Sequence, residues 1–173
     1  MRTDGSAAGP SAAPGGGAAA GRLPWWASIG SLVLALAGLV VSAYLTVEHY
    51  TSSVALACPD VGVINCQKVT SSQQSELFGL PVALLGLLFF LVMVVATLPV
   101  VWRVPSRALR RTRLGLAVLG VAFVIYLIYV ELFVVDAICL WCTAVHVLTL
   151  ALFAVVALGT ASVSSIESSF TQD

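Results

Sequence analysis

Charge is what this chain of 173 residues most lacks. Only 9% of its residues are charged, eight basic and eight acidic, whereas 60% are hydrophobic and the mean hydropathy is +1.03. Charged residues make up about a quarter of an ordinary soluble domain, so the composition excludes that class and predicts a membrane protein. Because the formal net charge is zero, the chain also lacks the basic surface that nucleic-acid binding requires, and no such partner is expected.

Hydrophobic runs long enough to cross a bilayer, which takes about 20 residues, occur four times. They cover about 27–47, 79–101, 114–135 and 138–158. We therefore predict an all-α fold, an integral membrane four-helix bundle over residues 25–161, with an extracytoplasmic loop or half-helix as a cap. Residues 1–24, rich in glycine and alanine, are expected to form a disordered cytoplasmic tail, and 162–173 a short polar cytoplasmic tail.

Basic residues are unevenly divided between the loops. The loop between the second and third spans carries five arginines, whereas the loop at 48–78 carries a single basic residue, Lys68. Short loops rich in arginine and lysine stay in the cytoplasm, which predicts cytoplasmic termini and an extracytoplasmic loop 48–78. All four cysteines then lie on the oxidising side of the membrane, where disulfides persist.

The four cysteines form two pairs. Cys139 and Cys142 make a CxxC motif at the start of the fourth span, and Cys58 and Cys66 lie in the polar loop. Positions i and i+3 share a helix face, and the positive end of a helix favours a thiolate. Two dithiols at one border of the membrane indicate electron transfer between a soluble thiol and a lipid-soluble acceptor.

The cysteines allow other interpretations. Thr143 follows the CxxC motif where covalent haem attachment needs a histidine. The seven residues between Cys58 and Cys66 do not match paired zinc knuckles, so no metal site is expected. A non-catalytic membrane scaffold, stapled by two structural disulfides, remains an alternative.

Three ionisable residues near the CxxC motif are further candidates. His146 lies one helical turn deeper than Cys142 on the same stripe, and it is the first candidate for supplying protons. Asp136 and Glu131 lie near the end of the third span, where burying a charge is costly unless it serves a function. Asp136 is the stronger of the two acidic candidates for proton handling.

The motifs resemble, in this order, those of bacterial homologues of vitamin K epoxide reductase. The resemblance runs from about Ala27 to Leu158. It rests on Cys58, Ile64-Asn65-Cys66, Val69-Thr70-Ser71-Ser72, Leu77-Phe78-Gly79-Leu80-Pro81 with Gly86, and Asp136 before Cys139-Leu-Trp-Cys142. It implies a four-helix bundle around a quinone, with the CxxC motif as the redox centre.

The resemblance also implies a role for each cysteine. Cys142 faces the quinone and Cys139 exchanges disulfides with Cys66, while Cys58 meets an exported thioredoxin-like (DsbA-like) partner. The chain does not extend to a fused thioredoxin domain of the kind some relatives carry, so a separate partner is expected.

Quinone contacts are expected at Ser72, Phe78, Asp136 and His146. Ser72 matches a serine that is characteristic of the family, and His146 stands where the animal enzymes carry a tyrosine. The histidine argues against vitamin K epoxide chemistry.

The predicted function is therefore that of a multi-pass thiol:quinone oxidoreductase in the bacterial cytoplasmic membrane. It would reoxidise the thioredoxin-like partner and pass the electrons to membrane quinone, with menaquinone favoured over ubiquinone. An enzyme that reduces quinone or its epoxide for the quinone's own sake is a further alternative, because the chemistry at Cys142 is the same.

Overall fold

The structure is a computed structural model that describes residues 25–51, 58, 61–77, 79–104 and 106–170, with side chains described up to residue 162. The predicted tail at 1–24 and Phe78 lie outside these residues.

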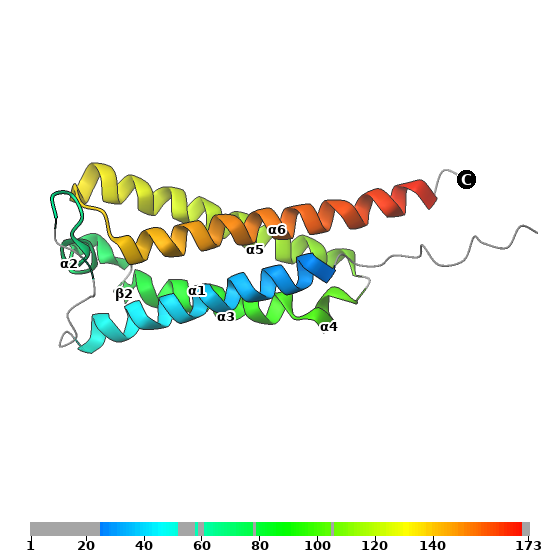
Figure 1. Ribbon diagram of the computed structural model, residues 1–173, viewed down its shortest axis with the longest axis horizontal. Coiled ribbons are helices and arrows are strands. Elements are labelled where there is room, and N and C mark those ends of the chain that lie inside the picture. Colours follow the sequence, from blue (N-terminus) through cyan, green and yellow to red (C-terminus); the bar gives the residue numbers. More distant parts are fainter. Residues whose placement is uncertain (1–24, 52–57, 59–60, 78, 105, 171–173) are drawn as a thin grey trace, which may run out of the picture.

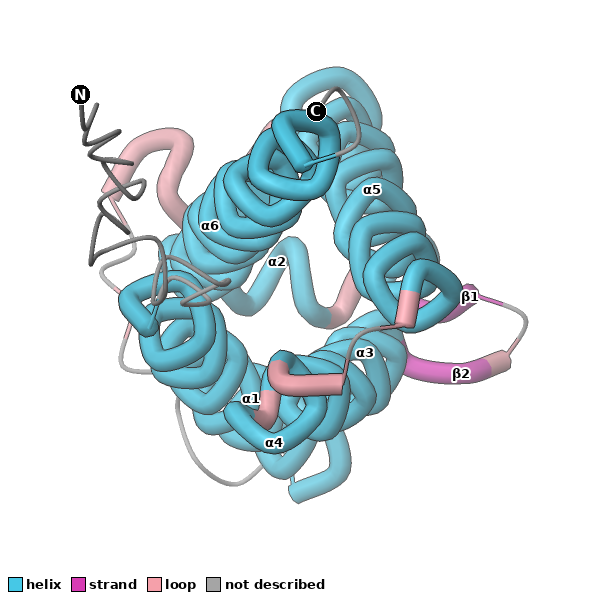
Figure 2. The backbone as a smooth tube through the Cα atoms, turned by 90° about the vertical axis from the view of Figure 1, so that its right-hand side faces the viewer, coloured by secondary structure: helices cyan, strands magenta, loops and turns pink. Residues whose placement is uncertain are grey.

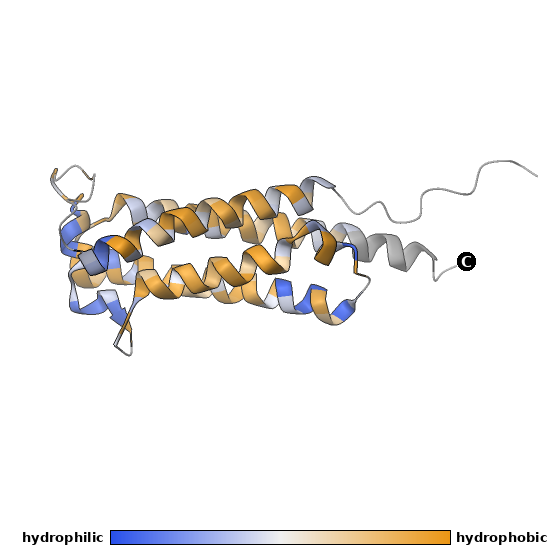
Figure 3. Cartoon of the chain, turned by 90° about the horizontal axis from the view of Figure 1, so that it is seen from below, coloured by the Kyte–Doolittle hydropathy of each residue, from blue (hydrophilic) through white to orange (hydrophobic). Residues whose placement is uncertain are grey.

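Within the described chain, four helices form the body of the molecule and surround a common axis (Figure 2). They are α1 (Trp25–Thr51), α3 (Val82–Thr97), α5 (Arg107–Val130) and α6 (Leu140–Phe170). α1 packs on both α3 and α6, and α5 packs on α6, whereas α3 and α5 make few contacts with each other. Apolar side chains cover most of the bundle's length and hydrophilic ones gather toward its ends (Figure 3). The prediction of an all-α membrane bundle is confirmed.

The second predicted span is shorter than expected. α1, α5 with its continuation to Val135, and α6 to residue 162 are long and apolar enough to cross a membrane, whereas α3 has 16 residues. α3 ends because Pro99 lacks an amide hydrogen and disfavours helical backbone at Leu98, where ψ is 138°. The chain then resumes as α4 (Pro99–Trp102), so the run predicted at 79–101 is divided between two helices.

Small residues allow the helices to approach closely in the middle of the bundle. A Cβ atom added to Gly38 of α1 would overlap the ring of Phe90 on α3, and one added to Gly120 of α5 would lie 2.6 Å from Cζ of Phe89. Small residues at such crossings are typical of membrane helices, where close packing drives association. The buried core at this level consists of Ala35, Phe90, Met93, Ala117, Leu152 and Val156.

The end of the bundle opposite α4 is covered by short elements, and we call it the capped end (Figure 1). The cap consists of α2 (Cys66–Thr70), the 3₁₀ turn η1 (Gln73–Ser75) and the antiparallel strands β1 (Glu76–Leu77) and β2 (Leu80–Pro81). Asn65 caps α2 by accepting a hydrogen bond from the Lys68 amide at 2.7 Å. The predicted half-helix cap is therefore present as α2 and η1.

The third and fourth long helices meet at the capped end through an unusual connection. α5 passes into a π-helical turn, η2 (Glu131–Val135), and the next residue, Asp136, is left-handed with φ 50°. α6 begins at Leu140 and remains helical to Phe170, so the helix runs across the predicted start of the polar tail at residue 162.

Candidate active site

The loop cysteines form a disulfide at the capped end. Cys58 and Cys66 are bonded, with their Cα atoms 6.1 Å apart. Cys66 begins α2 and is 2% exposed, whereas Cys58 is partly exposed. The two cysteines of the pair thus differ in exposure, with Cys66 the more buried.

Backbone hydrogen bonds hold the Cys66 segment against the start of α6. The Ile138 amide donates to the Val63 carbonyl at 2.8 Å, and the Asn65 amide donates to the Ile138 carbonyl at 3.1 Å. The Leu140 amide donates to Sγ of Cys66 at 3.3 Å. Cys66 therefore lies against the backbone that carries Cys139, although 74 positions separate Cys66 from Leu140.

The CxxC cysteines are free thiols that face different surroundings. Cys139 is fully buried next to the cap, and its Sγ accepts a hydrogen bond from the Cys142 amide at 3.3 Å. A hydrogen bond with the Cys142 side chain lowers the pKa of Cys139, which precedes the membrane-spanning part of α6. A thiol with a lowered pKa is more often a thiolate, the form that attacks disulfides.

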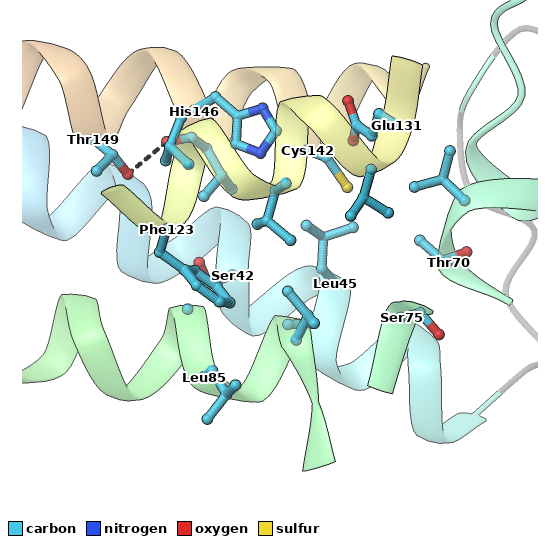
Figure 4. A pocket seen from close by; sticks show the side chains of 18 of the residues that line it. Ser42, Leu45, Thr70, Ser75, Leu85, Phe123, Glu131, Cys142, His146 and Thr149 are labelled. Atoms are coloured by element: carbon cyan, nitrogen blue, oxygen red, sulfur yellow. Dashed lines mark hydrogen bonds between the residues drawn. The ribbon is translucent and has the colours of Figure 1, made fainter. Parts of the chain in front are cut away.

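Cys142 lies one turn further along α6 and lines a cavity of about 340 Å³ inside the capped half of the bundle (Figure 4). His146 and Glu131 lie on the same side of this cavity as Cys142, and Ser42 and Leu45 approach from α1. Residues of α3 and α5 contribute to the walls, and Val69, Thr70, Ser72 and Ser75 close the end nearest the cap. A thiol thus borders a largely apolar chamber within the membrane-spanning bundle.

The sequence matches a known family over most of its length. A family model described as "Vitamin K epoxide reductase family" matches residues 29–157. The chain belongs to the vitamin K epoxide reductase family. It is accordingly a membrane protein of an oxidoreductase family whose redox chemistry involves quinones.

The cavity of this vitamin K epoxide reductase family member suits a quinone. Its volume falls within the range of about 300–1,000 Å³ that is usual for small-molecule sites, and such sites combine apolar walls with a few polar groups. Ser42 is one of its lining residues, and the Ser42 Oγ is buried and has no hydrogen-bond partner among the described residues. A hydroxyl group in that position can donate to a carbonyl oxygen, which is the polar group of a quinone.

The structure brings some of the predicted contact residues together. His146 is buried and lines the cavity with Cys142, and Ser72 lines it from the cap. Asp136 is exposed and is not among the residues that line the cavity, while its carbonyl oxygen accepts a hydrogen bond from Nζ of Lys68 at 3.5 Å. Phe78 lies outside the described residues. The quinone contacts assigned to these residues remain predictions.

Two cavity residues were underrated or missed by the sequence analysis. Glu131 was ranked below Asp136, yet it is only 7% exposed and lines the cavity next to Cys142 (Figure 4). Its position in a span was the available signal, because a buried carboxyl group is costly there. Ser42 was not among the predicted contact residues, and nothing in its sequence context indicates that its hydroxyl group is left without a partner.

Proposed function

We propose that this chain is a thiol:quinone oxidoreductase that reoxidises an exported thioredoxin-like protein and passes the electrons to membrane quinone. One observation carries the proposal: Sγ of Cys66 lies at the start of α6 beside Cys139, while Cys142 borders the cavity. The two cysteine pairs are thereby joined into a path from the outer surface to the interior of the bundle.

The first half of the path is a series of thiol–disulfide exchanges. A thiolate of the partner attacks Cys58 and releases Cys66 as a thiolate, and the partner's second thiol then displaces Cys58. Cys66 attacks Cys139 in the Cys139–Cys142 disulfide and releases Cys142. Cys58 finally displaces Cys139 from Cys66. The partner has lost two electrons and two protons, and the CxxC motif has gained them.

The second half returns the CxxC motif to its disulfide. Cys139 and Cys142 together give up two electrons and two protons, which convert one quinone to one quinol. Cys142 borders the cavity and holds the electron exit, while Cys139 restores the disulfide.

The setting that we infer is a bacterial cytoplasmic membrane, with the capped end outside and both termini in the cytoplasm. The arginine-rich stretch before and at the start of α5 supports this orientation, because it lies at the end opposite the cysteines. Menaquinone is the acceptor that we favour over ubiquinone. The exported thioredoxin-like partner is a separate protein.

A comparison of two electron donors tests the relay. With dithiothreitol, a small permeant thiol, Cys66→Ala is expected to retain quinone reduction, because the CxxC pair is unchanged. With a reduced thioredoxin-like protein as donor, the same variant is expected to lose it. Cys142→Ala is expected to be inactive with both donors. Loss of dithiothreitol-driven activity in correctly folded Cys66→Ala would contradict the proposed order of electron transfer.

A further inference from the structure

A buried carboxyl group lies beside the thiol at the electron exit. Glu131 is 7% exposed, belongs to the membrane-spanning part of the chain, and lines the cavity with Cys142. Figure 4 shows its carboxyl group next to the Cys142 thiol. An ionisable group inside a membrane span is expensive to retain, so it is a functional candidate wherever it contacts a reactive group.

The backbone around Glu131 is specialised in two ways. Glu131 opens the π-helical turn η2, and its carbonyl oxygen accepts a hydrogen bond from the Ala137 amide at 3.2 Å. Asp136, which lies between the two residues joined by this hydrogen bond, has a left-handed backbone conformation. This conformation is uncommon for a residue other than glycine. Single π-helical turns inside α-helices occur frequently at functional sites.

Apolar packing fixes this turn against the cap. Val130, Val135 and Ala137 form a small buried cluster, and Val69 of α2 packs against it. The turn therefore has apolar neighbours on the side of the cap, while the carboxyl group itself is directed to the cavity and Cys142 (Figure 4). This arrangement orients the Glu131 side chain without exposing it to water.

We propose that Glu131 is the acid–base residue of the CxxC centre, accepting the proton of the Cys142 thiol and delivering it within the cavity. This inference rests on the proposed function, and it assigns to Glu131 the role that the sequence analysis gave first to His146. The oxidation of the dithiol releases two protons, one from each sulfur. Glu131 takes the proton of Cys142 as that sulfur becomes a thiolate, and passes it to one oxygen of the acceptor. The proton of Cys139 supplies the second oxygen, so the quinol gains two electrons and two protons.

Several other ionisable groups surround this pair. Cys139 directly precedes α6, His146 lies on α6, and His49 of α1 lines the same cavity. Lys68 of α2 reaches the neighbouring Asp136 carbonyl group. Because interacting groups titrate together, the test has to separate the contribution of Glu131 from theirs.

The rate of Cys142 alkylation as a function of pH separates the contribution of Glu131 from the contributions of these neighbouring groups. In a full-length Cys139→Ala background with the Cys58–Cys66 disulfide intact, Cys142 is the one remaining thiol of the four cysteines. When a carboxyl group and a thiol share one proton, the fraction of the thiol that is present as thiolate is constant. It stays constant over the pH range in which the pair keeps that proton. We expect the iodoacetamide rate to be level through the neutral range. In Glu131→Gln, it is expected to rise by about tenfold per pH unit until the thiol has titrated.

Turnover measurements and two control variants complete the test. In the otherwise unaltered chain, Glu131→Gln is expected to lower the rate of quinone reduction by about 100-fold, the lower end for loss of a general acid–base, with little change in KM. Glu131→Asp keeps a carboxyl group and is expected to retain the level alkylation profile in the Cys139→Ala background. The matched control is Glu48→Gln, because Glu48 is a partly buried carboxylate of α1 outside the cavity lining, and its activity is expected to be unchanged.

The outcomes separate this inference from the function on which it rests. The alkylation profile is measured without quinone and without a protein partner, so it reports on the Glu131–Cys142 pair independently of turnover. Identical profiles for the Cys139→Ala background and its Glu131→Gln variant, or turnover of Glu131→Gln within twofold of the unaltered chain, would overturn the role of Glu131. Absence of quinone reduction by the unaltered chain would instead contradict the proposed function.

Discussion

Because α2 lies against the start of α6, we predict that the residue that caps the N-terminus of α2, Asn65, controls disulfide exchange between Cys66 and Cys139. Asn65 accepts a hydrogen bond from the Lys68 amide at 2.7 Å and so fixes the first turn of α2, which carries Cys66. Replacing a capping asparagine with alanine typically costs about 1 kcal/mol, whereas aspartate caps as well as asparagine. Since about 1.4 kcal/mol is a factor of ten, Asn65→Ala should lower the equilibrium constant between the correctly placed and displaced forms of Cys66 by about fivefold.

A redox titration measures this effect directly. With Cys58 and Cys142 replaced by alanine, the remaining thiols are Cys66 and Cys139, which can form one disulfide. Equilibration with glutathione gives its stability, and Asn65→Ala should lower the equilibrium constant about fivefold relative to this background. Asn65→Asp is the control and should leave it within about twofold. Failure of the Cys66–Cys139 disulfide to form in the background, or an unchanged constant in Asn65→Ala, would refute the reasoning.

Three further results are expected. Gly38→Ala should lower stability in detergent by about 1–3 kcal/mol, because the new methyl group overlaps the Phe90 ring; Gly115→Ala, which meets nothing within 4 Å, should be neutral or slightly stabilising, and equal thermal shifts would contradict the packing. His146→Ala should raise the KM for quinone about three- to tenfold through loss of a polar contact, and an unchanged KM would remove His146 from the quinone site. A membrane-impermeant maleimide should label Cys58 in intact, reduced cells, whereas labelling only after lysis would reverse the proposed orientation.

The sequence predicted the long helices because apolar runs of membrane length have few other structures available to them. The sequence also contains the residue that divides the second span, because Pro99 cannot continue the preceding helix. Hydropathy alone does not show this division, since one proline hardly changes the hydrophobicity of the run. The π-helical turn and the left-handed Asp136 had no comparable signal, because they result from packing between α5, α6 and the cap.

The active site was predicted unevenly for the same reason. Cysteine positions and the CxxC spacing follow directly from the residues, whereas the approach of Cys66 to Leu140 depends on hydrogen bonds between segments far apart in the chain. The ranking of Asp136 over Glu131 was made without knowledge of where either side chain points. The direction of each side chain was decided by η2, which places Glu131 at the cavity and leaves Asp136 exposed.

Anaerobic quinone reduction tests the central claim most directly. The purified chain is mixed with a reduced thioredoxin-like dithiol protein and a soluble quinone, and quinol formation is followed for the unaltered chain and for Cys142→Ala. The relay predicts quinol from the unaltered chain and none above background from the variant. No turnover by the unaltered, folded chain with its loop disulfide intact would contradict the relay and favour a stapled membrane scaffold.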